Sequence, residues 1–130
     1  MTTVLLDTHV LYWATSARNR LSEAAMDAIV GADDLAVASI TWFELAWLAT
    51  RGRIATPIPV MSWLEQLTER VRTVGINARI AATAVALPGS FPGDPADRLI
   101  YATAIERGWP LVTRDDRMRS HPHPRQVVVW

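Results

Sequence analysis

The sequence predicts an α/β domain in which a central parallel sheet carries helices on both faces. Short, wholly apolar runs recur along the chain, and segments with helical periodicity lie between them. Capping residues and glycines mark the points where most of these helices begin and end. Strands that alternate with helices form parallel sheets, because each helical connection returns the chain to the same end of the sheet.

Five segments are predicted to be strands. The first, second and fourth are apolar runs without alternation, which is typical of strands buried on both faces. The third has the weakest pattern. In chain order, the predicted strands are residues 4–6, 35–38, 72–76, 110–113 and 127–129.

The helices are predicted from periodicity and from their caps. Ser22, Asn77 and Asp94 are candidate N-caps, and Pro95 stands at the first helical position after Asp94. The third helix begins at Ser39 or Thr41, and Thr41 with Glu44 fits the spacing of a capping box. Gly31, Gly52 and Gly108 are expected to end the second, third and sixth helices, and the prolines around 57–59 and the segment 88–93 are interpreted as loops. The predicted helices are residues 8–14, 22–30, 39–51, 60–70, 78–87 and 95–107.

Length and composition narrow the class of protein. A chain of 130 residues with 50% hydrophobic content is expected to form one domain, residues 1–130, with a real core. No cysteine is present, which excludes disulfides and a zinc site built on thiolates. No signal peptide and no membrane span are expected, so we predict a soluble, cytoplasmic protein. The net charge is zero, so no overall positive field indicates nucleic-acid binding, and all 13 basic residues are arginine.

Four acidic residues from separate segments are predicted to meet at one edge of the sheet. Asp7 follows the first strand and Asp115 follows the fourth, whereas Glu44 and Asp97 lie in the first turns of two helices. In an open parallel sheet, functional side chains gather beyond the carboxyl ends of the strands. Crowded carboxylates repel one another unless a cation or a proton relieves the charge. A set of oxygen ligands without cysteine suits Mg²⁺ or Mn²⁺, which could activate water against a phosphodiester.

Each of these acids also has a structural interpretation. Asp7 and Asp94 could serve only as helix caps, and Glu44 could be only the capping-box partner of Thr41. Asp97 and Asp115 could be surface charges that favour a helix N-terminus. The coincidence of all four at the predicted edge favours a functional site.

At these motifs the chain resembles the PIN-domain nucleases, specifically the VapC-type toxins of type II toxin–antitoxin systems. The resemblance lies in LLDTHVLYW at 5–13, S-x-x-x-x-E at 39–44, RGRI at 51–54, DPADRLIYATA at 94–104 and LVTRD at 111–115. It implies a three-layer α/β/α sandwich with a central parallel sheet. It also implies an endoribonuclease that depends on Mg²⁺ or Mn²⁺, usually a homodimer, whose apolar groove receives the C-terminal segment of an antitoxin.

The family's acidic positions carry over to Asp7, Glu44, Asp97 and Asp115, and Thr8, Ser39 and Thr113 match supporting polar positions. The spacing from Thr113 favours Asp115 over Asp116. Whether Asp116 or Asp94 also contributes stays open, as do the number of metal ions, the RNA that is cleaved and the identity of the antitoxin.

Two other classes of protein are also compatible with parts of the pattern. A non-catalytic PIN-like binding module, or another Mg²⁺-dependent phosphotransfer domain such as a phosphatase or a receiver, would use a similar sheet; a receiver needs a lysine, which this chain lacks. Arg114, Arg117 and Arg119 flank the acids and could contact RNA phosphates, and Arg98 could do the same or pair with an acid. The segment from His121 to Pro124 is interpreted as a stiff loop without a role in metal binding.

Overall fold

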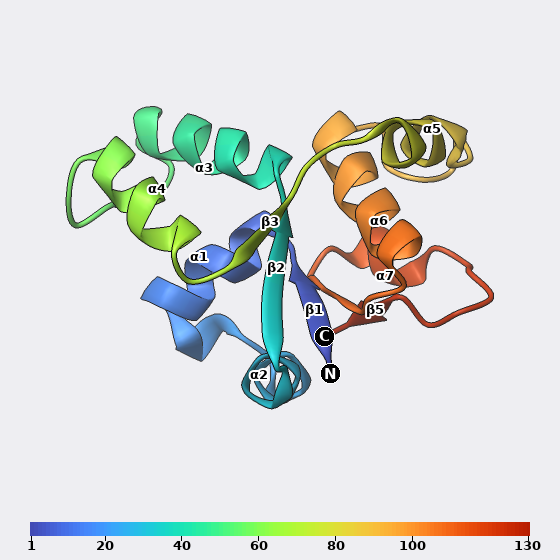
Figure 1. Cartoon of the computed structure of the whole chain (residues 1–130), viewed down its shortest axis with the longest axis horizontal. Coiled ribbons are helices and arrows are strands. Elements are labelled where there is room, and N and C mark those ends of the chain that lie inside the picture. Colours follow the sequence, from blue (N-terminus) through green and yellow to red (C-terminus); the bar gives the residue numbers. More distant parts are fainter.

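The computed structural model describes residues 1–130 and has five parallel strands at its centre (Figure 1). The strands are β1 (Thr3–Leu6), β2 (Asp34–Ala38), β3 (Arg72–Val74), β4 (Leu111–Val112) and β5 (Val128–Val129). Their order across the sheet is β3-β2-β1-β4-β5. All four strand pairings are parallel, so the predicted α/β fold with a central parallel sheet is confirmed.

Side chains that alternate along the strands divide the core into two layers. Val4 and Leu6 of β1 pack into one cluster with α1 to α4, whereas Leu5 between them packs into the other with α5, α6 and α7. Val112 and Leu111 of β4 divide in the same way. All of these strand residues are buried, which explains why the strands have no polar face in the sequence. The result is a three-layer α/β/α sandwich.

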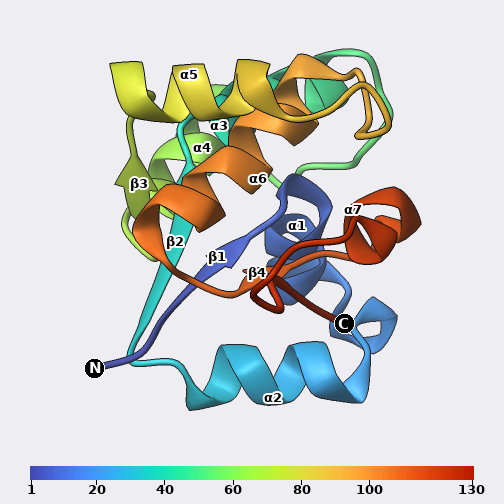
Figure 2. The same ribbon diagram turned by 90° about the vertical axis from the view of Figure 1, so that its right-hand side faces the viewer.

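Seven α-helices cover the sheet. They are α1 (Thr8–Ser16), α2 (Glu23–Gly31), α3 (Ile40–Thr50), α4 (Val60–Thr68), α5 (Ala78–Ala86), α6 (Pro95–Arg107) and α7 (Asp116–Ser120), with a short 3₁₀ turn at Arg18–Arg20. In both views α2 and α5 lie at opposite ends of the molecule (Figures 1 and 2). None of the helices has both the length and the apolar character needed to cross a membrane.

Most of the predicted caps are present. The side chains of Ser22, Asn77 and Asp94 accept hydrogen bonds from backbone N–H groups of α2, α5 and α6. Gly52 and Gly108 adopt positive φ angles of 70° and 69°, which glycine allows without steric cost. Around Gly52 the hydrogen bonds from Arg53 to Leu48 and from Gly52 to Ala49 close α3 with a Schellman motif.

Three local predictions were wrong or incomplete. Gly31 is the last residue of α2 and has no positive φ, so the helix ends at Ala32 without a glycine cap. Helix α7 was not predicted, because its five residues are too few to show a helical period. Thr41 lies inside α3, and Ser39 occupies the N-cap position without a side-chain hydrogen bond to the helix.

The order of the strands places the predicted acids. The chain leaves β1 toward β2 and β3 on one side, and later enters β4 and β5 on the other. The sheet therefore reverses its winding between β1 and β4, and such a switch point opens a crevice beyond the carboxyl ends of the two strands. Asp7 follows β1 and the segment 113–115 follows β4, so both lie at this crevice.

Candidate active site

Asp7 is held in place by two hydrogen bonds at the end of β1. One carboxylate oxygen accepts the backbone N–H of Thr8 at 2.8 Å, and the other accepts the Thr113 hydroxyl at 2.6 Å. The second bond follows from the pairing of Leu6 with Val112, which sets Asp7 beside Thr113. Burial raises the pKa of Asp7 above its usual value, and these two hydrogen bonds partly oppose the rise.

Glu44 is positioned by a chain of hydroxyl groups. Its carboxylate accepts a hydrogen bond from the Thr8 hydroxyl, whose oxygen lies 3.0 Å from the Thr41 hydroxyl oxygen. Since Thr8 has one hydroxyl proton and gives it to Glu44, Thr41 must donate to Thr8. Both threonines are buried. The capping-box interpretation of Thr41 and Glu44 is therefore wrong, because these side chains bond to α1 and not to the start of α3.

Burial and neighbouring charges also perturb Asp97. It lies in the first turn of α6, whose N-cap Asp94 accepts the Ala96 N–H at 2.8 Å and the Asp97 N–H at 3.2 Å. Burial, and then repulsion from Asp7, Asp94, Asp115 and Glu44, raises the pKa of Asp97 from 3.8 to about 7. A shift of this kind, with named charged neighbours, is typical of a functional site.

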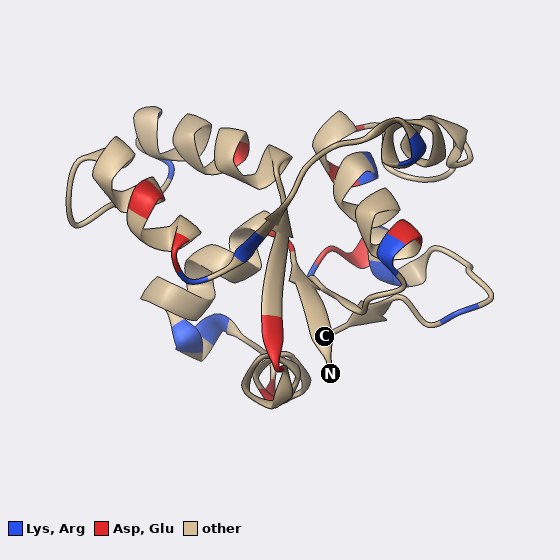
Figure 3. Cartoon of the chain, in the orientation of Figure 1, with Lys and Arg blue, Asp and Glu red and all other residues tan.

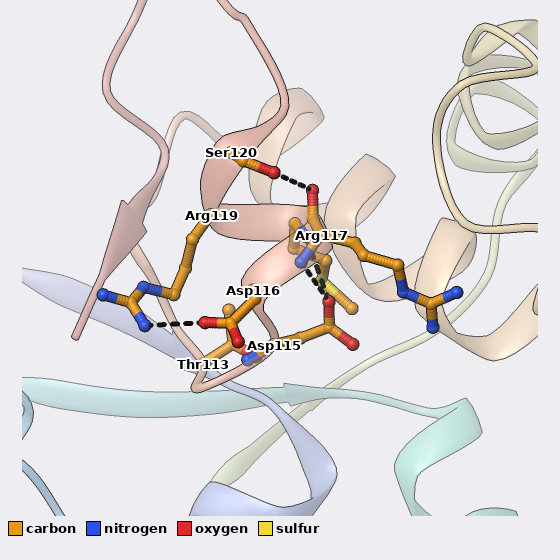
Figure 4. A network of polar contacts seen from close by, with 7 residues as sticks. Thr113, Asp115, Asp116, Arg117, Arg119 and Ser120 are labelled. Carbon is orange, nitrogen blue, oxygen red and sulfur yellow. Dashed lines mark hydrogen bonds and ion pairs between the residues drawn. The ribbon is translucent and has the colours of Figure 1, made fainter.

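Asp115 and Asp116 differ in their surroundings. Asp115 caps α7 by accepting the N–H groups of Arg117 and Met118 through one oxygen, which leaves its second oxygen without a partner (Figure 4). Its own N–H donates to the Thr113 hydroxyl that also binds Asp7. The Asp116 side chain is 92% exposed and pairs with Arg119 at 3.0 Å (Figure 4). These contacts support Asp115 as the site residue.

The four predicted acids line one cavity of about 560 Å³. Asp94 and Asp116 also line it, so six carboxylates face a single basic side chain, that of Arg114. Figure 3 shows arginines and acids spread around the whole molecule, so this acidic concentration is local. His9, Val10 and Trp13 complete the wall. Because all three follow Asp7 on α1, their place is a direct consequence of the strand–helix junction.

The arrangement suits a divalent cation in chemistry but is not closed around one. Carboxylate oxygens are the ligands that hard cations prefer. As the side chains stand, no three acidic or imidazole groups lie close enough together to hold a metal ion. Asp7 and Glu44 are turned toward threonine donors, and Asp115 uses one oxygen to cap α7. A cation would have to draw the freer side chains, Asp97 and Asp115, toward Asp7.

Arg98 does not reach the cavity. Its guanidinium donates five hydrogen bonds of 3.0–3.4 Å to backbone carbonyls, and the acceptors are Ala84, Leu87, Pro88, Phe91 and Pro92. Both sequence interpretations, a phosphate contact and an acid partner, were therefore wrong. The guanidinium instead ties down the loop that leads into Asp94 and α6.

Comparison with known proteins places the chain in a family. Residues 4–124 match the model of the PIN domain. The chain belongs to the PIN-domain family. It is 70% identical, over the full length of both chains, to Ribonuclease VapC22 of Mycobacterium tuberculosis (strain ATCC 25618 / H37Rv). The resemblance predicted from the sequence is thus confirmed, and a phosphatase or receiver domain is excluded.

Solved structures share the fold of this PIN domain. A toxin–antitoxin complex from Klebsiella pneumoniae has a chain with a TM-score of 0.69 and 23% identity, covering 98% of this chain and 96% of that one. DNA-bound VapBC from Salmonella typhimurium has a TM-score of 0.72 and 19% identity, with coverages of 98% and 97%. PIN-domain ribonucleases generally depend on a divalent metal, which agrees with the acidic lining described above.

Proposed function

We propose that this PIN-domain protein hydrolyses phosphodiester bonds in RNA and acts as the toxin of a toxin–antitoxin pair. The observation that carries the proposal is the cavity that six carboxylates line, in a chain 70% identical to a ribonuclease. Within it we assign Asp7, Glu44, Asp97 and Asp115 to the reaction. Asp94 and Asp116 have partners of their own, in the backbone of α6 and in Arg119.

Asp7 and Asp97 would hold Mg²⁺, or Mn²⁺ in its place. Glu44 and Asp115 would complete the set of ligands or orient water. When bound, such an ion lowers the pKa of water and offsets the charge that grows on the phosphodiester. The charge of the carboxylates is what matters, because amides of the same shape would not attract the ion.

The protein's own groups have separate tasks. Thr113 and the Thr8 N–H hold Asp7, and the Thr41–Thr8 chain holds Glu44, so these two carboxylates keep their positions without an ion. Asp97 lacks such donors and is free to turn toward the ion. Arg114 is the one cationic side chain of the cavity and would contact a substrate phosphate. In-line attack by water would leave 5′-phosphate and 3′-hydroxyl ends.

The test is cleavage of structured RNA in Mg²⁺ by the wild type and by Asp7→Asn and Asp97→Asn. Each substitution should lower the rate by roughly 100-fold or more, as expected when a group that stabilises the transition state is removed. Asp27→Asn is the matched control, since Asp27 is exposed on α2 and lines neither this cavity nor the groove, and it should retain most activity. Full activity of both site variants, or cleavage that EDTA leaves unchanged, would contradict the mechanism. A non-catalytic binding module would cleave nothing in any form.

A groove beside the cavity is the proposed place for the antitoxin. It has a volume of about 460 Å³, and its wall includes Phe43, Trp47, Ile40 and Pro95. Phe43 is 62% exposed and Trp47 49%, and the two rings lie 6.1 Å apart, so they form a contiguous exposed apolar patch. Because Glu44, His9 and Asp94 line both the groove and the acidic cavity, a peptide in the groove could send an arginine to the acids.

We also propose a homodimer, as the family resemblance implies, and a place in the cytoplasm, where both RNA and an antitoxin would be met. Copurification with the product of a neighbouring gene would test the antitoxin. Trp47→Ala should weaken that complex at least tenfold, because exposed tryptophans at interfaces are often hot spots. Unchanged affinity would show that the antitoxin binds to another surface.

A further inference from the structure

A second cavity of about 410 Å³ lies beside α7 and β5, and residues of the loop 121–126 form part of its wall. His121 and His123 line it, together with Arg119 and Arg125. Tyr101 of α6 and Trp130 belong to its wall as well. None of the residues that line it has a carboxylate side chain. In a chain with no net charge, the two cavities therefore carry opposite chemistry.

Tyr101 supplies the observation that points to a ligand. It is 1% exposed, and its ring packs against Phe91 at 4.8 Å and His121 at 5.6 Å between centroids. The hydroxyl of the chain's other tyrosine, Tyr12, donates to the Ala55 carbonyl, whereas the Tyr101 hydroxyl makes no hydrogen bond within the chain, and Tyr101 lines the cavity. A phenol keeps its proton at neutral pH, and burial raises the pKa of Tyr101 further, so the hydroxyl can donate a hydrogen bond to an acceptor.

The other polar groups favour an anion over a metal ion. His123 accepts the Arg125 N–H at 3.1 Å through Nδ1, so that nitrogen is already in use. No third acidic or imidazole group joins the two histidines to make a cation site. The Arg125 guanidinium is held by the carbonyls of Trp109 and Ala104 and contributes a fixed positive charge. Arg119 is 41% exposed and pairs only with the exposed Asp116, so it can turn to an incoming phosphate.

Helix α7 contributes residues to both this cavity and the acidic one. Asp116 lines the acidic cavity and its ion-pair partner Arg119 lines the second. On the far side, the rings of Trp13 and Trp130 lie 6.1 Å apart and belong to one cavity each. Because the Asp116–Arg119 ion pair and the Trp13–Trp130 contact each join a residue of one cavity to a residue of the other, the two cavities are adjacent.

We propose that the second cavity binds a nucleotide of the RNA substrate one or two positions from the cleaved bond. The phosphate contacts Arg119 and accepts a hydrogen bond from the Tyr101 hydroxyl. The base lies along the apolar part of the wall near Trp130. The inference rests on the proposed ribonuclease function. It explains how an acidic cavity, which repels RNA, can belong to an enzyme that binds it: a cationic subsite beside the cavity anchors the strand.

The experiment measures RNA binding without cleavage. A fluorescein-labelled, single-stranded oligoribonucleotide of eight residues is titrated with the full-length Asp7→Asn protein, and anisotropy is followed over a series of salt concentrations. Tyr101→Phe removes one hydroxyl and keeps the buried ring. Arg119→Gln removes the exposed charge. Arg117→Gln is the matched control, because Arg117 lies on the same helix, points away from Arg119 in Figure 4 and lines neither cavity.

Tyr101→Phe should weaken binding about tenfold with an unchanged salt slope, since it removes one hydrogen bond to a charged group. Arg119→Gln should weaken binding by a similar factor and reduce the salt slope by about one, since it removes one phosphate contact. Arg117→Gln should stay within about twofold. Melting curves of the three variants confirm that each is folded.

Two results would overturn the proposal. If Tyr101→Phe binds RNA as tightly as its parent, the hydroxyl does not contact the RNA. If Arg117→Gln and Arg119→Gln lose RNA affinity equally, the loss reflects the overall charge of the protein and not a specific phosphate contact. Cleavage by the wild-type protein is measured separately. If the wild type cleaves RNA but these variants bind normally, the subsite alone is wrong; if the wild type cleaves nothing, the proposed function is wrong.

Discussion

Replacing Asp97 with asparagine should stabilise the metal-free protein above neutral pH, although it removes a proposed metal ligand. Burial and four neighbouring carboxylates raise the pKa of Asp97 from 3.8 to about 7. The folded state thus binds this proton more tightly than the unfolded state does. The stability that protonation of Asp97 contributes is therefore complete below about pH 4. It is lost as the pH rises to about 7, and the protein stays less stable above that value.

The size of the effect follows from the shift. At 1.36 kcal/mol per pKa unit, the full shift corresponds to about 4 kcal/mol. Because Asp97 is partly exposed, solvent screening reduces this to an estimated 1–2 kcal/mol, on the order of what a partly solvated charge contributes. Asparagine keeps the shape and removes the charge. For a chain of this size the gain amounts to a rise in melting temperature of roughly 4–8 °C.

The assay is thermal unfolding of Asp97→Asn and wild type in EDTA at pH 5 and pH 8. The difference between the two proteins should be small at pH 5 and reach its full value at pH 8. Asp116→Asn serves as the control and should stay within about 0.5 kcal/mol of wild type, since its side chain is exposed. A variant that is less stable than wild type at pH 8, or a gain that is equal at both pH values, would refute the electrostatic crowding on which the site is built.

Three further predictions concern the ion, the hydroxyl chain and the loop anchor. Mg²⁺ at about 100 times its dissociation constant should stabilise the wild type by roughly 2.7 kcal/mol and Asp7→Asn far less; calorimetry with no shift for the wild type would argue against a metal site. Thr41→Val removes the donor that orders Thr8 and Glu44, so the rate of RNA cleavage should fall about tenfold, the usual value of one lost hydrogen bond. Thr15→Val is the control and should cleave normally, because the Thr15 hydroxyl bonds only within α1. Equal rates for both threonine variants would show that Glu44 needs no positioning. Arg98→Gln removes most of five hydrogen bonds to the carbonyls of residues 84–92 and should cost at least about 2 kcal/mol in urea unfolding; a loss below about 0.5 kcal/mol would mean that the loop holds itself.

Local signals were sufficient where the physics is local. Ser22, Asn77 and Asp94 were predicted as N-caps because a short polar side chain satisfies backbone N–H groups only two or three residues away. The same local logic failed for Thr41 and Glu44, whose spacing fits a capping box. Both side chains instead meet Thr8, 33 or more residues away along the chain, and no spacing rule can show such a partner.

Arginine and histidine show the same limit. The sequence placed Arg98 beside Asp97 and could suggest only an acid or a phosphate as its partner. The actual partners are five backbone carbonyls, which carry no signature in the sequence because every residue has one. Residues 121–124 are loop, as predicted, but the sequence could not show that Tyr101 of α6 shares a cavity with the two histidines.

The sequence by itself determined the class of fold and the acids of the candidate site. Buried strands that alternate with capped helices leave few arrangements other than a parallel sheet, and such a sheet brings the ends of its strands to one edge. Only the tertiary structure decided which polar groups hold those acids, how burial and neighbouring charges shift their pKa values, and where the opposite charge lies. Hydrogen bonds, burial and charge repulsion depend on distances between atoms that are remote in the chain, and packing alone sets those distances.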